Sequence, residues 1–323
     1  MSAGRWVVAA AALVMVAGCG TGPVPPGASA TITASVPSPS GVQSPAKVPP
    51  DRGKGCDPRA SLRPKGPLPT PAHMPPGSTM AHIQQGGHLI VGVNLNTYLL
   101  SFQDPTTGKM SGFEVDLARE IARALFGDPG KVAFRAVTSD QRIPVIRHHT
   151  VDLVVANMTM TCERWKQVSF STEYYEAGQR VLVNSQSKIE GKDQLGGKRV
   201  CASNGTTSIR QIATLPSRPK AMGVPDDVDC LVMLQQGTVD AISTDDILLE
   251  GLAAQDPDTK LVGPRFTEEP YGIAVATDAP DLVQFVNGVL ERLRKDGTWM
   301  KLYQKWLYAK FGSASPPAPR YKH

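Results

Sequence analysis

Residues 151–164 read VDLVVANMTMTCER. The first six are almost all apolar, which predicts a strand that is covered on both faces, as strands of parallel sheets are. The polar residues that follow lead from the end of this strand into a short helix that contains Arg164. Ligands of open α/β sheets bind outside the carboxyl ends of the strands, so we expect residues 157–164 to line a binding site.

Apolar patterns of strand and helix alternate on both sides of this stretch. Strands are expected at residues 89–93, 132–137, 180–184, 199–202, 239–243 and 271–276. Helices are expected at residues 113–125, 140–149, 206–214, 228–236, 246–254, 282–295 and 298–307. Two successive blocks of this kind, separated by a strand, predict an α/β fold with two lobes. Each lobe would be a mostly parallel sheet flanked by helices, and crossing strands would join them.

The N-terminus has the pattern of a bacterial lipoprotein signal. An uncharged apolar run at residues 6–17 follows Arg5, and residues 16–19 read VAGC. The run is shorter than the ~20 apolar residues that span a bilayer, but it suits a secretory signal peptide at residues 1–18. Cys19 looks like a lipobox cysteine: the chain would be cut just before it, and its thiol and amine would be acylated, which holds the protein on the membrane, outside the cytoplasm. The alternative is an uncleaved signal-anchor with a chance cysteine.

Residues 19–79 are predicted to form a lipidated, proline-rich tether. Fifteen of the 28 prolines lie between Pro23 and Pro76, interleaved with Gly, Ser, Thr and Ala. Such a segment cannot bury enough apolar surface to offset the entropy that is lost on ordering. The tether would let the globular part stand clear of the membrane. Residues 313–323 are likewise expected to form a flexible C-terminal tail.

Charge and composition exclude some classes of partner. The chain has 34 basic and 29 acidic residues, a net charge of +5, and it has no basic run or stripe of basic and aromatic residues. Nothing therefore indicates a nucleic-acid partner. The cysteine spacings resemble no zinc site, and we expect neither a metal nor a cofactor.

Four cysteines remain besides Cys19, and an even number favours two disulfides in an exported chain. Three pairings can be drawn. We expect Cys201–Cys230, because both residues fall within one predicted lobe, and Cys56–Cys162, which would pin the end of the tether to the folded body. Buried free cysteines are the alternative.

Two polar segments at predicted strand ends are candidates for ligand binding. In residues 157–164, the guanidinium of Arg164, with hydroxyls five and three residues earlier, offers a planar fork that can take a carboxylate in two parallel hydrogen bonds. In residues 203–208, SNGTTS, a glycine turn leads into a helix whose first free N–H groups, at Thr206 to Ser208, form an anion site. Taken singly, the first feature is more often a surface arginine and the second a helix N-cap.

Six motifs occur in one order along the chain: residues 112–118 (GFEVDLA), 157–164, 170–175 (FSTEYY), 205–208 (GTTS), 236–241 (QGTVDA) and 297–299 (GTW). Over roughly residues 85–308 the chain resembles the polar amino-acid family of extracytoplasmic solute-binding proteins, the receptors of ATP-driven importers. Within this family it is similar to the actinobacterial glutamate/glutamine-binding lipoproteins. The resemblance implies a periplasmic-binding-protein fold whose lobes close on a ligand like a hinge. Lobe 1 would comprise residues 80–178 and 272–312, and lobe 2 residues 179–271.

The resemblance also implies a ligand site. Arg164 and the Thr159 hydroxyl would hold the α-carboxylate of an amino acid, helped by the N–H of Thr207. Asp245 would meet the α-ammonium, with the Asn157 carbonyl nearby. Both charges of the ligand need such partners, because an uncompensated buried charge costs several kcal/mol.

The pocket for the ligand side chain depends on three further residues. Asn94 and Tyr98, in the loop after the first strand, would supply a polar contact and an aromatic wall, although this loop is a residue longer than in many relatives. Arg142 would hold a side-chain carboxylate or amide from the first lobe; the alternative is a surface arginine or one that serves a helix. The expected ligands are glutamate or aspartate, ahead of glutamine and asparagine.

The resemblance implies a monomeric binding protein that works outside the cytoplasm and delivers its ligand to an importer permease. One alternative is a sensor subunit that reports the ligand to a membrane receptor. A more remote one is an enzyme, since some cyclic-acid dehydratases resemble this family. The sequence has no Ser-His-Asp set and no paired carboxylates at suggestive positions, so we expect a binding protein and not an enzyme.

Overall fold

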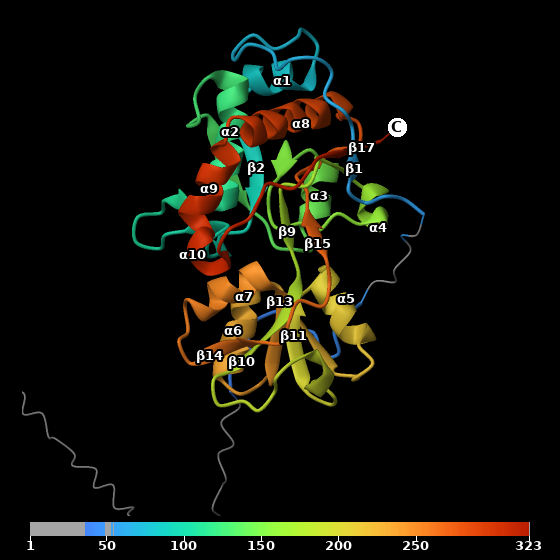
Figure 1. Cartoon of the computed structure of the whole chain (residues 1–323), viewed down its shortest axis with the longest axis vertical. Helices are drawn as coiled ribbons and strands as arrows, with labels where there is room; N and C mark the ends of the chain where they lie inside the picture. The colour runs from blue at the N-terminus through green and yellow to red at the C-terminus, as the bar shows by residue number, and fades with distance from the viewer. Residues whose placement is uncertain (1–35, 49–52, 54, 323) are drawn as a thin grey trace, which may run out of the picture. The chain divides into compact units, whose positions relative to one another are not determined.

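Two five-stranded sheets form the two lobes of the protein (Figure 1). They are seen in a computed structural model that describes residues 36–48, 53 and 55–322. The sheet of the first lobe has the order β6 (Val132–Ala136), β2 (Leu89–Val93), β7 (Leu153–Val154), β16 (Ala274–Val275) and β8 (Ser169–Phe170). The sheet of the second lobe has the order β12 (Lys220–Val224), β11 (Arg199–Ser203), β13 (Ala241–Asp245), β10 (Gln179–Asn184) and β14 (Thr259–Val262).

Each sheet combines three parallel strands with two strands that are added by antiparallel pairing. In the first lobe, β2 pairs in parallel with β6 and β7, whereas β16 runs antiparallel to β7 and β8. In the second lobe, β11 pairs in parallel with β12 and β13, whereas β10 runs antiparallel to β13 and β14. This shared pattern confirms the α/β fold with two lobes that the alternating apolar patterns predict.

Two antiparallel strands run between the lobes (Figure 1). They are β9 (Tyr175–Ala177) and β15 (Glu269–Tyr271), which form a two-stranded sheet of their own. Their register pairs Tyr175 with Tyr271 and Ala177 with Glu269. The chain leaves the first lobe through β9 and returns to it through β15, so these are the crossing strands that the two-lobed fold requires. We call them the hinge strands.

Helices cover the sheets on both faces. α2 (Phe113–Phe126) buries the face whose apolar residues recur every four positions, and it packs against α8 (Pro280–Lys295) and α9 (Thr298–Trp306). Further helices in the described part are α1 (Thr79–Gln85), α3 (Arg142–Arg147), α4 (Cys162–Trp165), α5 (Thr207–Thr214), α6 (Asp227–Gln235), α7 (Asp246–Ala253) and α10 (Tyr308–Phe311), with a 3-10 turn at Lys192–Gln194. A small sheet is formed by β3 (Asn96–Thr97), β4 (Ser101–Gln103) and β5 (Met110–Ser111). Across the described residues we find no helix long and apolar enough to cross a membrane.

The C-terminal tail, expected to be flexible, is paired with the end of the expected tether. β1 (Ala60–Ser61) and β17 (Arg320–Tyr321) form a two-stranded parallel sheet beside the first lobe. The N–H of Lys322 continues this pairing by donating to Ser61 O (2.8 Å). Each segment supplies the backbone partners that the other lacks, and a prediction from local composition cannot see such a partner.

The expected tether is also folded in part. Gln43 pairs antiparallel with Gly223 at the edge of β12, through N–H···O bonds of 2.7 and 2.9 Å. Leu62 and Met74 pack against the core of the first lobe. The segment cannot form a core of its own, but it buries its few large apolar residues against a core that the lobes already provide. Cys19 and the predicted signal peptide lie outside the described residues.

Both predicted disulfides are present. Cys56 and Cys162 have Cα atoms 5.8 Å apart, and Cys201 and Cys230 have Cα atoms 5.6 Å apart. The first bond ties residue 56 to the start of α4, and the second joins β11 to α6 within the second lobe. Because 106 residues separate Cys56 from Cys162, closing this loop is worth about 5 kcal/mol in the chain-entropy account of disulfides.

A buried asparagine on α8 anchors the N-terminal segment to the first lobe. Asn287 is fully buried, and its Oδ1 accepts a hydrogen bond from Thr172 N (2.6 Å). Its Nδ2 donates to Ser61 Oγ (2.8 Å) and to Leu62 O (2.7 Å). One side chain therefore holds both the segment around β1 and the loop after β8.

We expect Asn287→Ala to lower the free energy of unfolding by about 2–4 kcal/mol, because it leaves the buried Thr172 N–H without a partner and removes the donor to Ser61 Oγ and Leu62 O. Urea unfolding measures the change. Gln284→Ala is the matched control on the same helix; it removes only an exposed hydrogen bond to Arg63 O (3.1 Å), so its loss should stay below about 1 kcal/mol. Equal losses in the two variants would mean that Asn287 does not anchor the segment.

Candidate ligand-binding site

The lobes meet at a cluster of buried polar side chains that lie at strand ends. The first lobe contributes Asn94, which follows β2, and residues 157–164, which follow β7. The second lobe contributes residues 204–207, which follow β11, and Asp245, the last residue of β13. The structure thus brings together, across the two lobes, the polar segments that the sequence analysis singles out.

Arg164 contacts both lobes. Its backbone is fixed by the N-cap of α4, where Thr161 Oγ1 accepts from Arg164 N (3.2 Å). Its Nη1 donates to Thr159 O (2.7 Å) and its Nη2 to Gly205 O (3.0 Å), and the residue is 8% exposed. Burial, with the neighbouring Arg142 guanidinium, lowers the pKa of Arg164 to about 9, so it is charged at neutral pH. Each Nη carries a second N–H, which leaves the fork able to bind an anion.

The hydroxyls expected to bind a ligand carboxylate already bind a carboxylate of the protein. Thr159 Oγ1 and Thr207 Oγ1 both donate to Glu269 Oε2, at 2.7 and 2.8 Å. Glu269 is the first residue of the hinge strand β15 and is 4% exposed. The sequence analysis did not include it; the available signal was an acid two residues before the predicted strand that begins at residue 271. The pair of hydroxyls, one from each lobe, is therefore arranged for an anionic oxygen.

Thr206 caps a helix. Its Oγ1 accepts from Ile209 N (3.1 Å) and donates to Ser203 O (2.7 Å), which makes it the N-cap of α5. The side chain is thus engaged in capping, the alternative that a single Ser/Thr cluster favours. Thr207 is the first residue of the helix, and its N–H is one of the first-turn donors without an intrahelical partner.

Asp245 is a buried acid with one unpaired oxygen. It is 4% exposed; Oδ2 accepts from Tyr271 Oη (2.5 Å), and Oδ1 has no hydrogen-bond partner among the described residues. Burial, and then the nearby Glu269 carboxyl, raise the pKa of Asp245 well above its usual range. A cationic donor at Oδ1 would offset the cost of burying this carboxylate, so Asp245 fits an ammonium group.

Arg142 lies inside the protein and not at its surface. It begins α3 and is 3% exposed, with Nε donating to Ser139 O (2.9 Å) and Nη1 to Ala156 O (2.9 Å) and Asn157 O (3.1 Å). The Asn157 carbonyl, expected near the ligand ammonium, is thus also an acceptor for Arg142. The Nη2 of Arg142 makes no hydrogen bond to a described residue, so it is the donor that the side chain can offer to a ligand.

Two buried acids that the sequence analysis did not include surround Arg142. Glu114, at the start of α2, is fully buried; its Oε1 accepts from Asn157 N (2.6 Å) and Tyr174 Oη (2.5 Å), and burial raises its pKa to about 7. Asp227 accepts from Ser203 Oγ (2.7 Å), and burial raises its pKa to about 6. Both acids interact electrostatically with the Arg142 guanidinium. Glu114 belongs to the GFEVDLA motif, which was the signal that could have pointed to it.

The loop after β2 places its two predicted residues differently. Asn94 is 6% exposed, and its Nδ2 donates across the lobes to Asp226 Oδ1 (3.1 Å). Tyr98 is 41% exposed and packs edge-on against Phe102, with ring centroids 5.7 Å apart. Leu99 adopts a left-handed backbone with φ of 76°, which turns the chain sharply at this point. The structure therefore includes Asn94 in the buried cluster and leaves Tyr98 at its outer edge.

Asp246 is the first residue of α7, and Asp245 is the N-cap of this helix. Asp246 Oδ2 accepts from Arg265 Nε (2.6 Å), and Oδ1 accepts from Gly178 N (3.3 Å) at the end of the first hinge strand. The residue therefore ties α7 to the hinge.

Comparison with known proteins agrees with this geometry. Residues 89–309 match the bacterial extracellular solute-binding proteins, family 3. The ABC transporter glutamine-binding protein GlnH of Bacillus subtilis is 36% identical over 230 residues, which cover 71% of this chain and 84% of the relative. The L-glutamate/L-aspartate-binding protein of Pseudomonas aeruginosa is 31% identical over 241 residues, which cover 71% and 79%.

A solved structure shares the fold. An ancestral arginine-binding protein bound to glutamine has a TM-score of 0.65 and 36% sequence identity, and the match covers 70% of this chain and 99% of that one. Together with the family match, these relatives confirm a solute-binding protein of the ABC-transporter class and not an enzyme. The chain belongs to family 3 of the bacterial extracellular solute-binding proteins.

Proposed function

We propose that this chain is a lipid-anchored receptor that closes its two lobes on an acidic or amide L-amino acid and delivers it to an ATP-driven importer. The observation that carries the proposal is the buried Oδ1 of Asp245, which lies beside the Arg164 fork and has no hydrogen-bond partner in the part of the chain that the structure describes. An amino acid carries one ammonium and one carboxylate a few ångströms apart. Asp245 and Arg164 supply one partner for each.

The α-carboxylate would bind Arg164 together with the N–H and hydroxyl of Thr207 and the hydroxyl of Thr159. Each hydroxyl carries one proton, so a hydrogen bond to the ligand replaces its bond to Glu269. The guanidinium and the N–H need no such exchange. Because Arg164 comes from the first lobe and Thr207 and Asp245 from the second, the complete set of bonds exists only when the lobes meet.

The ligand side chain would meet Arg142 and Asn94. Arg142 Nη2 can donate to a carboxylate or to an amide oxygen, and its positive charge favours the carboxylate. We therefore place glutamate and aspartate ahead of glutamine and asparagine. The named ligands of the two relatives above, glutamine and glutamate/aspartate, belong to this same group.

Two arginine variants separate binding from selectivity. We expect Arg164→Ala to abolish binding of all four amino acids, because it removes the partner of the α-carboxylate. Arg142→Gln should lower the affinity for glutamate and aspartate by roughly 10–100-fold, which corresponds to the loss of one hydrogen bond to a charged group. The affinity for the amides should fall much less. Titration calorimetry measures both. Arg147→Gln, an exposed position on the same helix, is the control. Equal losses for acids and amides in Arg142→Gln would show that Arg142 does not read the side-chain charge.

The preference for acids over amides should increase as the pH falls from 8 to 6. The pKa of Glu114 is raised to about 7 and that of Asp227 to about 6, so both carry less negative charge at pH 6 and compensate Arg142 less. A ligand carboxylate stays ionised over this pH range and binds the less compensated Arg142 more strongly, whereas a neutral amide does not. The ratio of glutamate to glutamine affinity should rise about threefold or more, and Glu114→Gln should flatten this rise.

Glu120→Gln, on the same helix as Glu114, serves as the control for the pH experiment, since Glu120 pairs with Arg123 and Arg292. If the ratio of glutamate to glutamine affinity of the wild type is constant between pH 6 and 8, Glu114 and Asp227 do not influence the side-chain pocket. The α-ammonium and α-carboxylate are shared by both ligands, so their direct contacts with Asp245 cancel in the ratio.

Membrane attachment rests on Cys19 alone. We expect Cys19→Ala to move the protein from the membrane fraction to the soluble extracytoplasmic fraction and to remove incorporation of labelled palmitate. The amino-acid affinity of the released protein should match that of the wild type, because residue 19 precedes the folded lobes. Retention of Cys19→Ala on the membrane would favour the uncleaved signal-anchor instead. A monomer is expected in both cases.

A further inference from the structure

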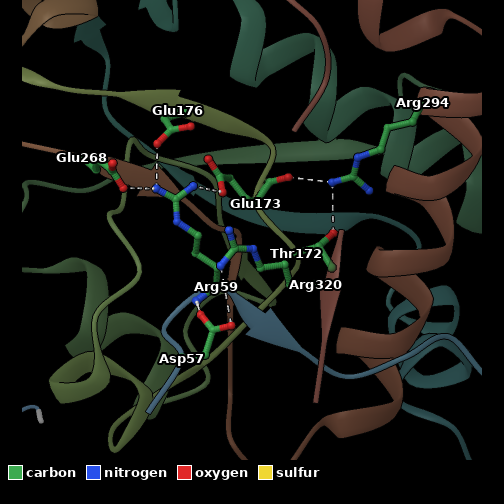
Figure 2. A network of polar contacts seen from close by, with 8 residues as sticks. All are labelled: Asp57, Arg59, Thr172, Glu173, Glu176, Glu268, Arg294 and Arg320. Carbon is green, nitrogen blue, oxygen red and sulfur yellow. Dashed lines mark hydrogen bonds and ion pairs between the residues drawn. The ribbon is translucent and has the colours of Figure 1, made fainter. Parts of the chain in front are cut away.

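An arginine in the N-terminal segment lies against both hinge strands (Figure 2). Arg59 Nη1 donates to Glu173 Oε2 (2.8 Å), and its Nη2 donates to Glu176 Oε1 (2.6 Å) and Glu268 Oε2 (2.9 Å). Glu176 lies in β9, and Glu268 directly precedes β15. One guanidinium therefore joins three carboxylates from the two connections between the lobes.

The first lobe fixes the position of Arg59. Trp165 Nε1 donates to Pro58 O (2.8 Å), and Ser61 Oγ donates to Phe170 O (2.6 Å). The disulfide of Cys56 and the pairing of β1 with β17 hold the segment on either side. The arginine side chain is only 15% exposed. It reaches from this fixed backbone to the hinge, so its contacts must change if the second lobe rotates.

The hinge residues next to these contacts belong to the ligand site. Glu269 follows Glu268 and accepts from the hydroxyls of Thr159 and Thr207. Two residues further, Tyr271 donates to Asp245 Oδ2 (2.5 Å). A shift of β15 therefore moves the groups around the predicted carboxylate and ammonium sites. The family match begins at residue 89, so Arg59 lies outside the part of the chain that the family shares.

We propose that Arg59 is a positioning residue for ligand binding, which braces the two hinge strands against the first lobe in the arrangement where the lobes touch. The inference rests on the proposed function. Without the guanidinium, the buried Glu173 loses its partner, and Glu176 of β9 faces Glu268 beside β15 as a like charge. Repulsion between carboxylates on the two connections favours separation of the strands. Fewer molecules then have the binding-competent arrangement, and the apparent affinity falls in proportion.

The test is calorimetry with L-glutamate and L-glutamine on the whole chain in detergent. Arg59→Gln should lower the affinity for both ligands by the same factor, roughly tenfold. Arg59 contacts neither ligand and acts only through the fraction of molecules whose lobes are closed. Arg59→Lys should recover part of the loss, since it restores the charge but not the fork. Arg63→Gln is the control from the same segment; Arg63 stacks over the Tyr321 ring at 4.5 Å, and its loss should leave both affinities unchanged.

Hydrogen exchange distinguishes a hinge brace from a general contribution to folding. In ligand-free Arg59→Gln, the amides of β9 and β15 should exchange faster, whereas those of β2 and β6 should not change. The effect should increase as the pH rises. Burial raises the pKa of Glu173 and the loss of Arg59 raises it further, so Glu173 adds its charge to the repulsion only at higher pH. Exchange that rises throughout the first lobe, or wild-type affinities in Arg59→Gln, would overturn the proposal.

Two further outcomes keep the two proposals apart. If the wild type binds neither amino acid, the proposed ligand class fails, but the exchange rates of the hinge strands still test the brace. If Arg59→Gln does not fold, the double variant Glu176→Gln/Glu268→Gln removes two exposed partners, whose side chains are 43% and 81% accessible. This variant should lower the affinity for both ligands and speed amide exchange in β9 and β15. Unchanged affinities and exchange rates would refute the proposal that Arg59 braces the hinge.

Discussion

Charges buried between the lobes have to be paired from both sides, and much of the structure depends on this constraint. Arg142 and Arg164 reach the cluster from the first lobe, Asp227 and Asp245 come from the second, and Glu269 comes from the hinge. Removing any one of these groups from water without a partner would cost several kcal/mol. The strand ends that carry the charges, the hinge strand between them and the contact of the lobes are thus parts of one electrostatic arrangement.

Much of this arrangement could be predicted from the sequence, because it follows from local patterns. The alternation of apolar runs predicts two α/β lobes, and the strand at residues 151–156 is followed by the polar segment that contains Arg164. The pairing of Cys201 with Cys230 could be predicted because both fall within one predicted lobe, which leaves Cys56 in the expected tether as the partner of Cys162. The role of Asp245 is predicted through resemblance to the family, and the prediction agrees with its burial and with an oxygen that has no hydrogen-bond partner among the described residues.

The remaining features depend on partners that are distant in the sequence. Glu114 reads as an ordinary acid in the first turn of a helix, and only the approach of Asn157 and Tyr174 shows that it is part of the cluster. From the sequence alone, Thr206 can be a ligand contact or a helix N-cap. The hydrogen bond that its hydroxyl accepts from Ile209 N shows that the side chain caps the helix. The composition of the proline-rich segment predicts no ordered structure. Its described residues are nevertheless ordered, because the lobes supply an apolar surface and a strand edge for them.

The order of the N-terminal contacts along the chain gives the protein a mechanical property. A pull on the N-terminus first meets the pairing of Gln43 and Ala46 with β12, which is made of backbone hydrogen bonds that can break one after another. Next comes the Cys56–Cys162 bond, which transfers load directly to α4 and which tension alone does not open easily. Arg59 lies beyond that bond and keeps its contacts under load. Once the pairing with β12 has broken, a pull on the chain therefore enters the first lobe at α4 and not the hinge strands.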